Sequence, residues 1–509
     1  MSLTSQPPLL TKLLRTKAIG SGSGSGMHRT LSAWDLVVFG VSAMIGTGIF
    51  VLTGEAAANA AGPALVISIV LTAVLCGFCA LCYSELSAAI PVSGSAYAYI
   101  YTCMGEFAAW LTGWILVTEY MASVMTIAMG WGRTITHFLH TMLHIDIPVV
   151  ISQNTIEVLE QGQQAAQPSL VALQQAFTLP GSSEPLTLVL NQSFNLLPFL
   201  GLLVVTYLLC KGIEDNAKFA TAMVYIKTAV IVLFIISSVV FLVAHPQILH
   251  ANWFANGWQT FAPFGWDGIA KGAALMFFAY VGFDALACSA EEAKNPARDL
   301  PIGIIGSLII CSILYALVTA GVTGVVPLAQ IDKEAAVIHA MGMMNIPIAD
   351  WIVNIGAIAG ISSVLLVLQM ACVRATFAIA RDGLLPKALG TINERIGAPL
   401  TATLLIGGIN ALGAGLLPLT LLAHIANLGT LFAFMMVCLA VVALRVTQPL
   451  LDRPFKIPGG IAIALCGAVG CFAMMLQLSS LSWVIGLIIT IIGVGIYLGY
   501  GQFNSRLNS

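Results

Sequence analysis

The chain has 509 residues, of which 59% are hydrophobic and 8% charged, and its formal net charge at pH 7 is −2. Soluble domains carry about 25% charged residues, so a mean hydropathy of +0.95 is that of an integral membrane protein. The near-neutral charge argues against a nucleic-acid partner, because such partners require basic surfaces. The 11 cysteines lie in or beside apolar runs, and we therefore expect free thiols rather than disulfides.

The N-terminal residues 1–30 are predicted to form a cytoplasmic tail. No apolar stretch of the kind found in signal peptides precedes Leu31. The sequence GSGSGSG at Gly20–Gly26 is typical of a flexible linker, and it is left out of the fold prediction.

Apolar runs of about 20 residues are long enough to cross a bilayer as helices. Such runs lie at 34–58, 63–89, 106–137, 194–211, 217–244, 268–290, 301–325, 350–378, 399–417, 420–445, 461–480 and 482–501. They predict an all-α integral membrane protein with 12 transmembrane helices.

Lysine and arginine placement predicts the orientation of these helices. All but Arg133, Lys227, Lys271 and Lys333 lie before the first run, after the last, in alternate loops, or at the ends of the runs that meet in those loops. Cytoplasmic loops carry an excess of basic residues. We therefore expect both termini to be cytoplasmic in a multi-pass protein of the plasma (inner) membrane.

The polar segment Thr141–Ser193 contains no lysine or arginine and is predicted to be external. Its apolar positions are expected to form short amphipathic helices that cap the protein. These positions are Ile156, Val158, Leu159, Leu170, Val171 and Leu173.

Two of the apolar runs contain helix-breaking sequences. Ala43–Phe50 reads AMIGTGIF, and Phe277–Ala285 reads FFAYVGFDA. They lie in the first helices of two five-helix blocks, 31–245 (with the insert 141–193) and 246–450; the last two helices occupy 451–509. Matched interruptions predict an inverted-repeat transporter. Unwound amides attract a carboxylate and unwound carbonyls accept from an ammonium, so a free amino acid fits. Close helix packing is the other use of Gly46 and Gly48.

The motifs resemble those of the amino acid–polyamine–organocation transporters, and among them the bacterial relatives of the cationic amino acid transporters. Besides the two broken segments, the resemblance rests on AGPAL, PVSGSAYAY, EEAKNPARDLPIGI and RDGLLP at 61–65, 91–99, 291–304 and 381–386. It implies the LeuT-type fold, with a 5+5 inverted repeat plus two helices, and alternating access. It does not cover the insert.

The resemblance also implies the residues of the binding site. The substrate carboxylate would meet the amides of Gly46, Thr47 and Gly48. The ammonium would meet the carbonyls of Met44, Phe278, Ala279 and Val281, and the Phe278 ring would close over the substrate as a gate.

Lys227 lies deep in its apolar run, where a lysine costs ~2.5–3.5 kcal/mol on insertion scales. The resemblance places its ammonium where sodium-coupled relatives hold a cation, with Ser362 and Ser363 on the helix 8 side. Because loss of its proton removes this charge, Lys227 is a candidate for proton coupling; a fixed structural cation is the alternative.

Asp284 and Glu119 are deep acids. Asp284 follows the second break and is a second candidate for coupling. Glu119 is expected to contact Asp284 or to receive the substrate side chain, together with the helix face around Leu368 and Gln369. The alternative for both acids is that they satisfy backbone amides.

Two further clusters were weighed as metal sites. Cys76, Cys79 and Cys82 share a helix face and are interpreted as a helix interface, because no histidine lies nearby. A histidine cluster, His137, His140 and His144, has only Asp146 close by. We predict no metal and no cofactor.

Three functional classes follow from this reading. The sequence lacks the set of catalytic residues that an enzyme would need. A nutrient sensor would usually carry a larger cytoplasmic domain. We therefore predict a secondary transporter of L-amino acids, cationic, small neutral or both, that is coupled to protons. An amino acid exchanger and a sensor that uses the same pocket are the alternatives.

Overall fold

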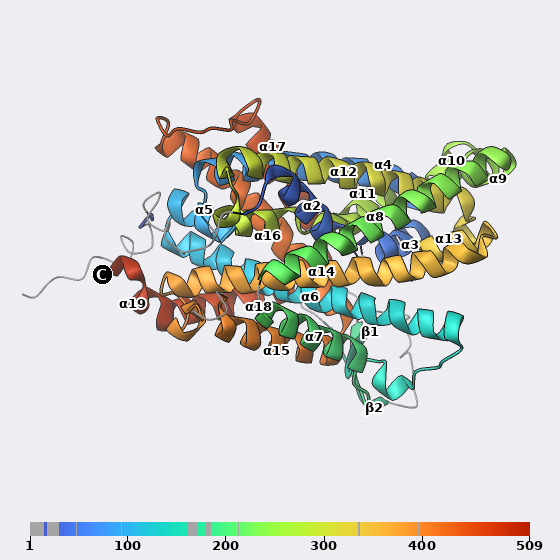
Figure 1. The fold of residues 1–509 in the computed structure, drawn as a ribbon, viewed down its shortest axis with the longest axis horizontal. Coiled ribbons are helices and arrows are strands. Elements are labelled where there is room, and N and C mark those ends of the chain that lie inside the picture. The colour runs from blue at the N-terminus through green and yellow to red at the C-terminus, as the bar shows by residue number, and fades with distance from the viewer. Residues whose placement is uncertain are drawn as a thin grey trace, which may run out of the picture.

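The computed structural model describes residues 15–17, 30–46, 48–92, 94–159, 171–178, 185–211, 213–333, 336–393 and 398–508. The described chain is mostly helical, and its long helices run along the long axis of the molecule (Figure 1). Eight segments are long and apolar enough to cross a membrane: Thr53–Ala89, Glu106–Leu143, Ala222–Ala244, Trp258–Glu292, Pro296–Val325, Trp351–Arg381, Leu421–Thr447 and Ser480–Asn504. The Gly20–Gly26 linker lies outside the described residues.

The helices follow the predicted apolar runs, with boundaries that differ by less than two helical turns. The longer ones are α4 (Leu65–Ala89), α6 (Glu106–Leu143), α8 (Ile213–Ala244), α12 (Pro296–Val325), α14 (Pro347–Arg381), α16 (Leu419–Thr447) and α18 (Ser480–Ile496). Shorter apolar helices are α2 (Ala33–Met44), α7 (Leu196–Lys211), α15 (Leu400–Leu416) and α17 (Ile461–Leu476).

Two of the predicted runs are not continuous helices. The first consists of α2, a break, and the short pieces η1 (Gly48–Leu52), α3 (Thr53–Ala56) and η2 (Ala57–Ala61), before η3 (Gly62–Ala64) leads into α4. The second consists of α11 (Gly265–Met276), η7 (Phe277–Tyr280), a break, and η8 (Phe283–Glu292). Both predicted interruptions are therefore present in the fold.

Further short helices lie between the long ones. They are α5 (Ala96–Cys103), α9 (Pro246–Leu249), η6 (His250–Phe254), α10 (Trp258–Phe261), α13 (Ala336–Met343) and α19 (Gln502–Asn504). The prediction included none of them, because none is long enough to give an apolar run of its own.

The second broken segment lies at the centre of the molecule. In its most apolar 18-residue window, within Trp258–Glu292, 94% of residues are buried, against 22% for Ser480–Asn504. Around it, α4 packs against α12, and α6 packs against both α14 and α16. The irregular backbone is therefore enclosed by protein, which is the condition under which a membrane protein tolerates it.

The described part of the segment predicted to form amphipathic helices forms a β-sheet instead, and Leu170 lies outside the described residues. Strands β1 (Ile156–Leu159) and β2 (Val171–Thr178) both pair antiparallel with β3 (Pro185–Asn191), in the order β1-β3-β2. The sheet lies beside one end of α7 (Figure 1). The helical prediction was wrong because β-branched residues favour strands, and because β1 and β2 depend on pairing with β3, which lies outside the apolar positions that indicated helices.

Asn154 attaches this sheet to the helices. Its amide donates to the carbonyls of Ala414 and Leu417 at the end of α15, at 2.8 Å each. Its side-chain oxygen accepts from Asn195 at 3.2 Å. One side chain thus joins the loop before β1, the segment after β3 and α15.

The cysteine stripe lies at a helix interface, as predicted. Cys76, Cys79 and Cys82 on α4 are fully buried. The sulfur of Cys79 lies 3.5 Å from that of Cys471 on α17 and 3.9 Å from that of Cys438 on α16. The small thiols therefore let three helices approach closely.

Candidate functional site

At the first break, two glycines pack closely against other elements. α2 ends at Met44, and Ile45 adopts an extended conformation (φ −73°, ψ 95°). A Cβ at Gly46 would lie 2.8 Å from a methyl carbon of Val364, and one at Gly48 would lie 2.5 Å from the Cα of Ala279. Thr47, predicted to bind the substrate carboxylate, lies outside the described residues.

The second break makes the reciprocal contact. Val281 leaves the helical conformation (φ −59°, ψ 131°), and Gly282 has φ +124°, which L side chains rarely adopt. A Cβ at Gly282 would lie 2.8 Å from the carbonyl oxygen of Ala43. Each break thus packs a glycine on the backbone of the other, Gly48 on Ala279 and Gly282 on Ala43, and the two segments cross at this point.

Lys227 reaches the first break from α8. Its side chain is fully buried, and its ammonium donates to the carbonyls of Ser42 (2.8 Å) and Ile45 (2.9 Å) and to the Ser363 hydroxyl (2.9 Å). The last carbonyls of a helix have no partner within the helix, so a cation there satisfies them. Ser362, predicted beside Ser363, instead accepts from the Trp131 indole at 2.8 Å.

Tyr315 on α12 joins the two breaks, and sequence reasoning did not find it. Its hydroxyl lies 2.7 Å from the Met44 carbonyl oxygen and 2.9 Å from that of Ala279. These are two of the carbonyls predicted to receive the substrate ammonium. A tyrosine in an apolar run carries no local signal of such a contact.

The other predicted ammonium acceptors and the gate lie in the same segment. The Phe278 carbonyl accepts from the Val281 amide at 3.2 Å, as part of the turn before the break. The Phe278 and Val281 residues are each 5% exposed. A carbonyl oxygen has two acceptor sites. A carbonyl that accepts one hydrogen bond within the protein can therefore accept a second one from a ligand.

Asp284 caps the second break. One of its carboxylate oxygens accepts from the Gly282 amide at 3.2 Å, and the other accepts from the Tyr120 hydroxyl. This part of the alternative interpretation, an acid that satisfies a backbone amide, agrees with the geometry. The residue is 1% exposed.

The hydrogen bonds of Glu119 go to residues other than Asp284. One oxygen accepts from Ser123 (3.1 Å) and Thr430 (2.9 Å), and the other has no hydrogen-bond partner among the described residues. The Gly429 position, where a Cβ would lie 2.6 Å from the Glu119 Cβ, leaves room for this side chain. A buried carboxylate oxygen without a donor is an acceptor available to a ligand.

The predicted specificity face of α14 is also buried. Leu368 and Gln369 are both fully buried. The Gln369 side-chain oxygen accepts from Asn410 at 2.7 Å, and its amide nitrogen has no partner among the described residues. The face is polar at this one position.

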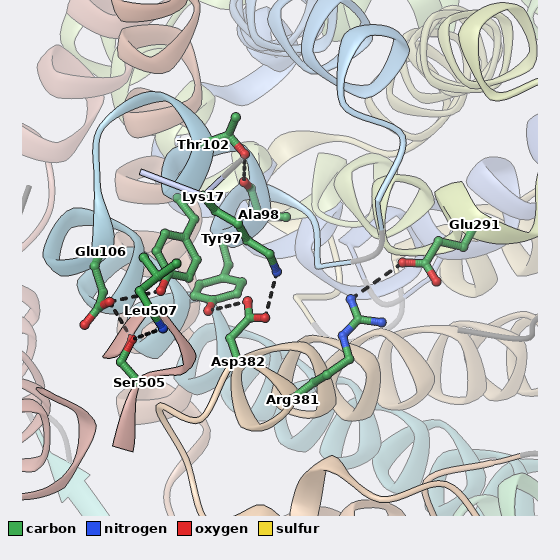
Figure 2. A network of polar contacts seen from close by, with 11 residues as sticks. Lys17, Tyr97, Ala98, Thr102, Glu106, Glu291, Arg381, Asp382, Ser505 and Leu507 are labelled. Atoms are coloured by element: carbon green, nitrogen blue, oxygen red, sulfur yellow. Dashed lines mark hydrogen bonds and ion pairs between the residues drawn. The ribbon is translucent and has the colours of Figure 1, made fainter. Parts of the chain in front are cut away.

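Asp382, at the end of α14, contacts residues from near both ends of the chain, among them Lys17 (Figure 2). Lys17 pairs with it at 2.7 Å, the Tyr97 hydroxyl donates to it at 2.9 Å, and the Arg506 amide donates to its backbone carbonyl at 3.1 Å. Burial, and then the charge of Asp382, raise the pKa of Tyr97, which keeps that hydroxyl a donor. Lys17 and Arg506 therefore lie at the same end of the bundle.

Two of the sequence motifs face each other beside this cluster. Arg381 lies 3.7 Å from Glu291 (Figure 2). Arg374, two turns earlier on α14, pairs with Glu292 at 2.5 Å. The end of α14 is thus tied to the end of η8, which continues from the second break. A displacement of η8 has to change these ion pairs.

Comparisons with known proteins identify the family of the chain. The family model described as amino acid permease matches residues 31–497. The chain is 39% identical to the branched-chain amino acid permease BcaP of Bacillus subtilis (strain 168), over 96% of this chain and 97% of the relative. It is 35% identical to the methylthioribose transporter of the same organism, over 98% of each.

A plant relative adds a third named activity. The chain is 34% identical to the vacuolar cationic amino acid transporter 2 of Arabidopsis thaliana, over 86% of this chain and 64% of the relative. The chain therefore belongs to the amino acid permease family.

Proposed function

We propose that the protein is a secondary active transporter that moves L-amino acids, cationic, small neutral or both, across the plasma (inner) membrane by alternating access, coupled to protons. The observation that carries this proposal is the crossing of the two broken helices, where carbonyls and amides freed from helical bonding meet at the buried centre of the molecule. Membership of a permease family supports the transporter class.

The proposed architecture has 12 transmembrane helices in a LeuT-type 5+5 inverted repeat plus two helices. The two breaks support it, because each lies in the first helix of a five-helix block, 31–245 and 246–450. α17 and α18 follow within 451–509. Both termini are proposed to be cytoplasmic, on the basis of the basic residues in alternate loops.

Both charges of an amino acid find partners at the crossing. We assign the substrate carboxylate to the amides of the segment Gly46–Gly48, including Thr47. The ammonium is assigned to the carbonyls of Met44, Phe278, Ala279 and Val281. Carboxylates bind backbone amides freed at helix starts, and ammonium groups bind carbonyls freed at helix ends.

Lys227 is assigned to proton coupling. Its ammonium lies on the carbonyls of Ser42 and Ile45, where it would repel a sodium ion. Two unit charges a few Å apart repel by about 4 kcal/mol at an effective dielectric near 20, which corresponds to roughly three decades of affinity. Transport is therefore expected to be independent of Na⁺, and Asp284 is the second group assigned to coupling.

Uptake by purified protein in proteoliposomes tests the proposal. The panel contains arginine, lysine, alanine, leucine, valine and methylthioribose, since the relatives are named for cationic and branched-chain amino acids and for methylthioribose. We expect uptake of at least one amino acid, faster with an inward proton gradient and unchanged when Na⁺ is replaced by K⁺.

The same vesicles separate the alternatives. An exchanger would need an amino acid inside the vesicle and would not respond to the proton gradient. A sensor would bind amino acids without uptake. Uptake that rises with external Na⁺ at constant pH would contradict the coupling assigned to Lys227.

A further inference from the structure

The roles assigned above leave Tyr315 without a function, although it touches both breaks. Its side chain is fully buried on α12. Its ring packs edge-on against Tyr280, with centroids 5.3 Å apart and an interplanar angle of 71°. The hydroxyl is thereby fixed between the Met44 carbonyl of one broken helix and the Ala279 carbonyl of the other.

These two carbonyls differ from their neighbours in what meets them. Ser42 and Ile45 receive the Lys227 ammonium, and Phe278 receives the Val281 amide. For Met44 and Ala279, the side-chain donor within the described residues is Tyr315. A hydroxyl carries a single proton, so the two acceptors share one donor, and each oxygen keeps at least one free acceptor site.

One oxygen within 2.9 Å of both carbonyls also restricts how far they can move apart. At the two glycine contacts no side chain interlocks the segments, because glycine has none. An ammonium has three donors and gains most from acceptors already gathered at one place, since preorganisation lowers the ordering cost of binding.

We propose that Tyr315 is the positioning residue of an α-ammonium subsite, holding the Met44 and Ala279 carbonyls together so that both accept from the same substrate ammonium. This rests on the proposed function and deepens it. The subsite requires ligands that carry an ammonium on the carbon next to a carboxylate, and it gives no advantage to a sugar such as methylthioribose.

The test compares two ligands in three proteins. The ligands are leucine, or whichever amino acid of the panel binds best, and its analogue without the amino group (for leucine, 4-methylpentanoate). The proteins are wild type, Tyr315→Phe and Tyr280→Phe, whose hydroxyl contacts the Ile69 carbonyl instead. Calorimetry gives Kd for the amino acid, and competition against it gives the inhibition constant of the analogue.

Tyr315→Phe is expected to weaken amino acid binding about tenfold. This corresponds to the loss of roughly one hydrogen bond between a carbonyl and the substrate ammonium. Binding of the analogue should change less than twofold, and Tyr280→Phe should change neither ligand by more than that. An equal loss for both ligands would show a merely structural role and overturn the inference. So would unchanged amino acid affinity.

Two outcomes have to be kept apart from these. If the wild-type protein binds no amino acid, the proposed function fails and the subsite fails with it. If Tyr315→Phe does not fold, Tyr315→His, which stays polar but places no hydroxyl between the two carbonyls, is measured in the same way. A loss for the amino acid that exceeds the loss for the analogue supports the subsite, and equal losses overturn it.

Discussion

The first broken helix has unpaired backbone carbonyls at its break, and the second has unpaired backbone amides. Side chains of opposite charge bind to the two sets of groups. α2 ends at its break and exposes carbonyls, which receive the Lys227 ammonium. η8 begins at its break and exposes amides, and there Gly282 donates to the Asp284 carboxylate. Helix ends carry partial negative charge and helix starts partial positive charge. The comparison teaches that the sign of each buried side chain follows from the chain direction at its break.

The contact shared by both breaks should be the most sensitive to change. Gly48→Val is expected to abolish substrate binding, a loss of at least about 100-fold, because a side chain there meets the Ala279 backbone and blocks the approach to the amides. Binding to purified protein measures this. The matched control is Gly408→Val on α15, where a Cβ would meet nothing within 4 Å.

Membrane insertion of the Gly48→Val protein should be normal, since the helices themselves are retained. Wild-type affinity in this variant would remove the Gly46–Gly48 segment from the binding site.

The first break should depend on its cation. Lys227→Met keeps the chain length but removes the donor to Ser42 and Ile45, so we expect binding about tenfold weaker and uptake that no longer varies with pH. Uptake is measured in proteoliposomes from pH 5.5 to 8.5. Lys271→Met, an exposed lysine paired with Asp267 at 2.7 Å, is the control.

A Lys227→Met protein with the wild-type pH profile would leave Lys227 as a fixed structural cation. Proton coupling would then have to be sought at Asp284.

The second break should respond in rate rather than in affinity. Asp284→Asn still accepts from Tyr120, but its amide faces the Gly282 N–H as a second donor. We expect the maximal uptake rate to fall about fivefold, with KM within about twofold of wild type, because the start of η8 is held less firmly. A raised KM with an unchanged rate would contradict a role in linking the substrate to η8.

The smallest effect is expected where neither break is touched. Glu119 has a carboxylate oxygen without a partner in the described part of the chain. Because glutamine keeps an acceptor oxygen but not the charge, Glu119→Gln should lower the ratio of arginine to alanine binding about threefold. Competition binding with both amino acids measures the ratio. An unchanged ratio would show that Glu119 does not discriminate between substrate side chains.

Local patterns predicted much of this molecule. Apolar runs of spanning length placed the long helices, and glycines within two of them placed both breaks. A lysine in hydrocarbon needs partners, and its position beside the first break agreed with the expected Ser363 contact. Ser362 differs by one residue, hence by about 100° around the helix, and faces Trp131 instead.

Contacts between distant segments were not predictable in the same way. The Tyr315 hydroxyl meets a carbonyl 271 positions away, and nothing in its own run of residues indicates this. The structure of the insert was predicted wrongly for a related reason. Its strands satisfy their backbone groups through β3, and strand pairing depends on partners rather than on local periodicity.

The attachment of the insert by Asn154 has a consequence for folding order. Asn154 contacts the Ala414 and Leu417 carbonyls, 260 and 263 positions further along the chain. At a synthesis rate of about 5–20 residues per second, β3 leaves the ribosome tens of seconds before α15 does. The bonds of Asn154 to the end of α15 therefore form later than the strands are synthesised.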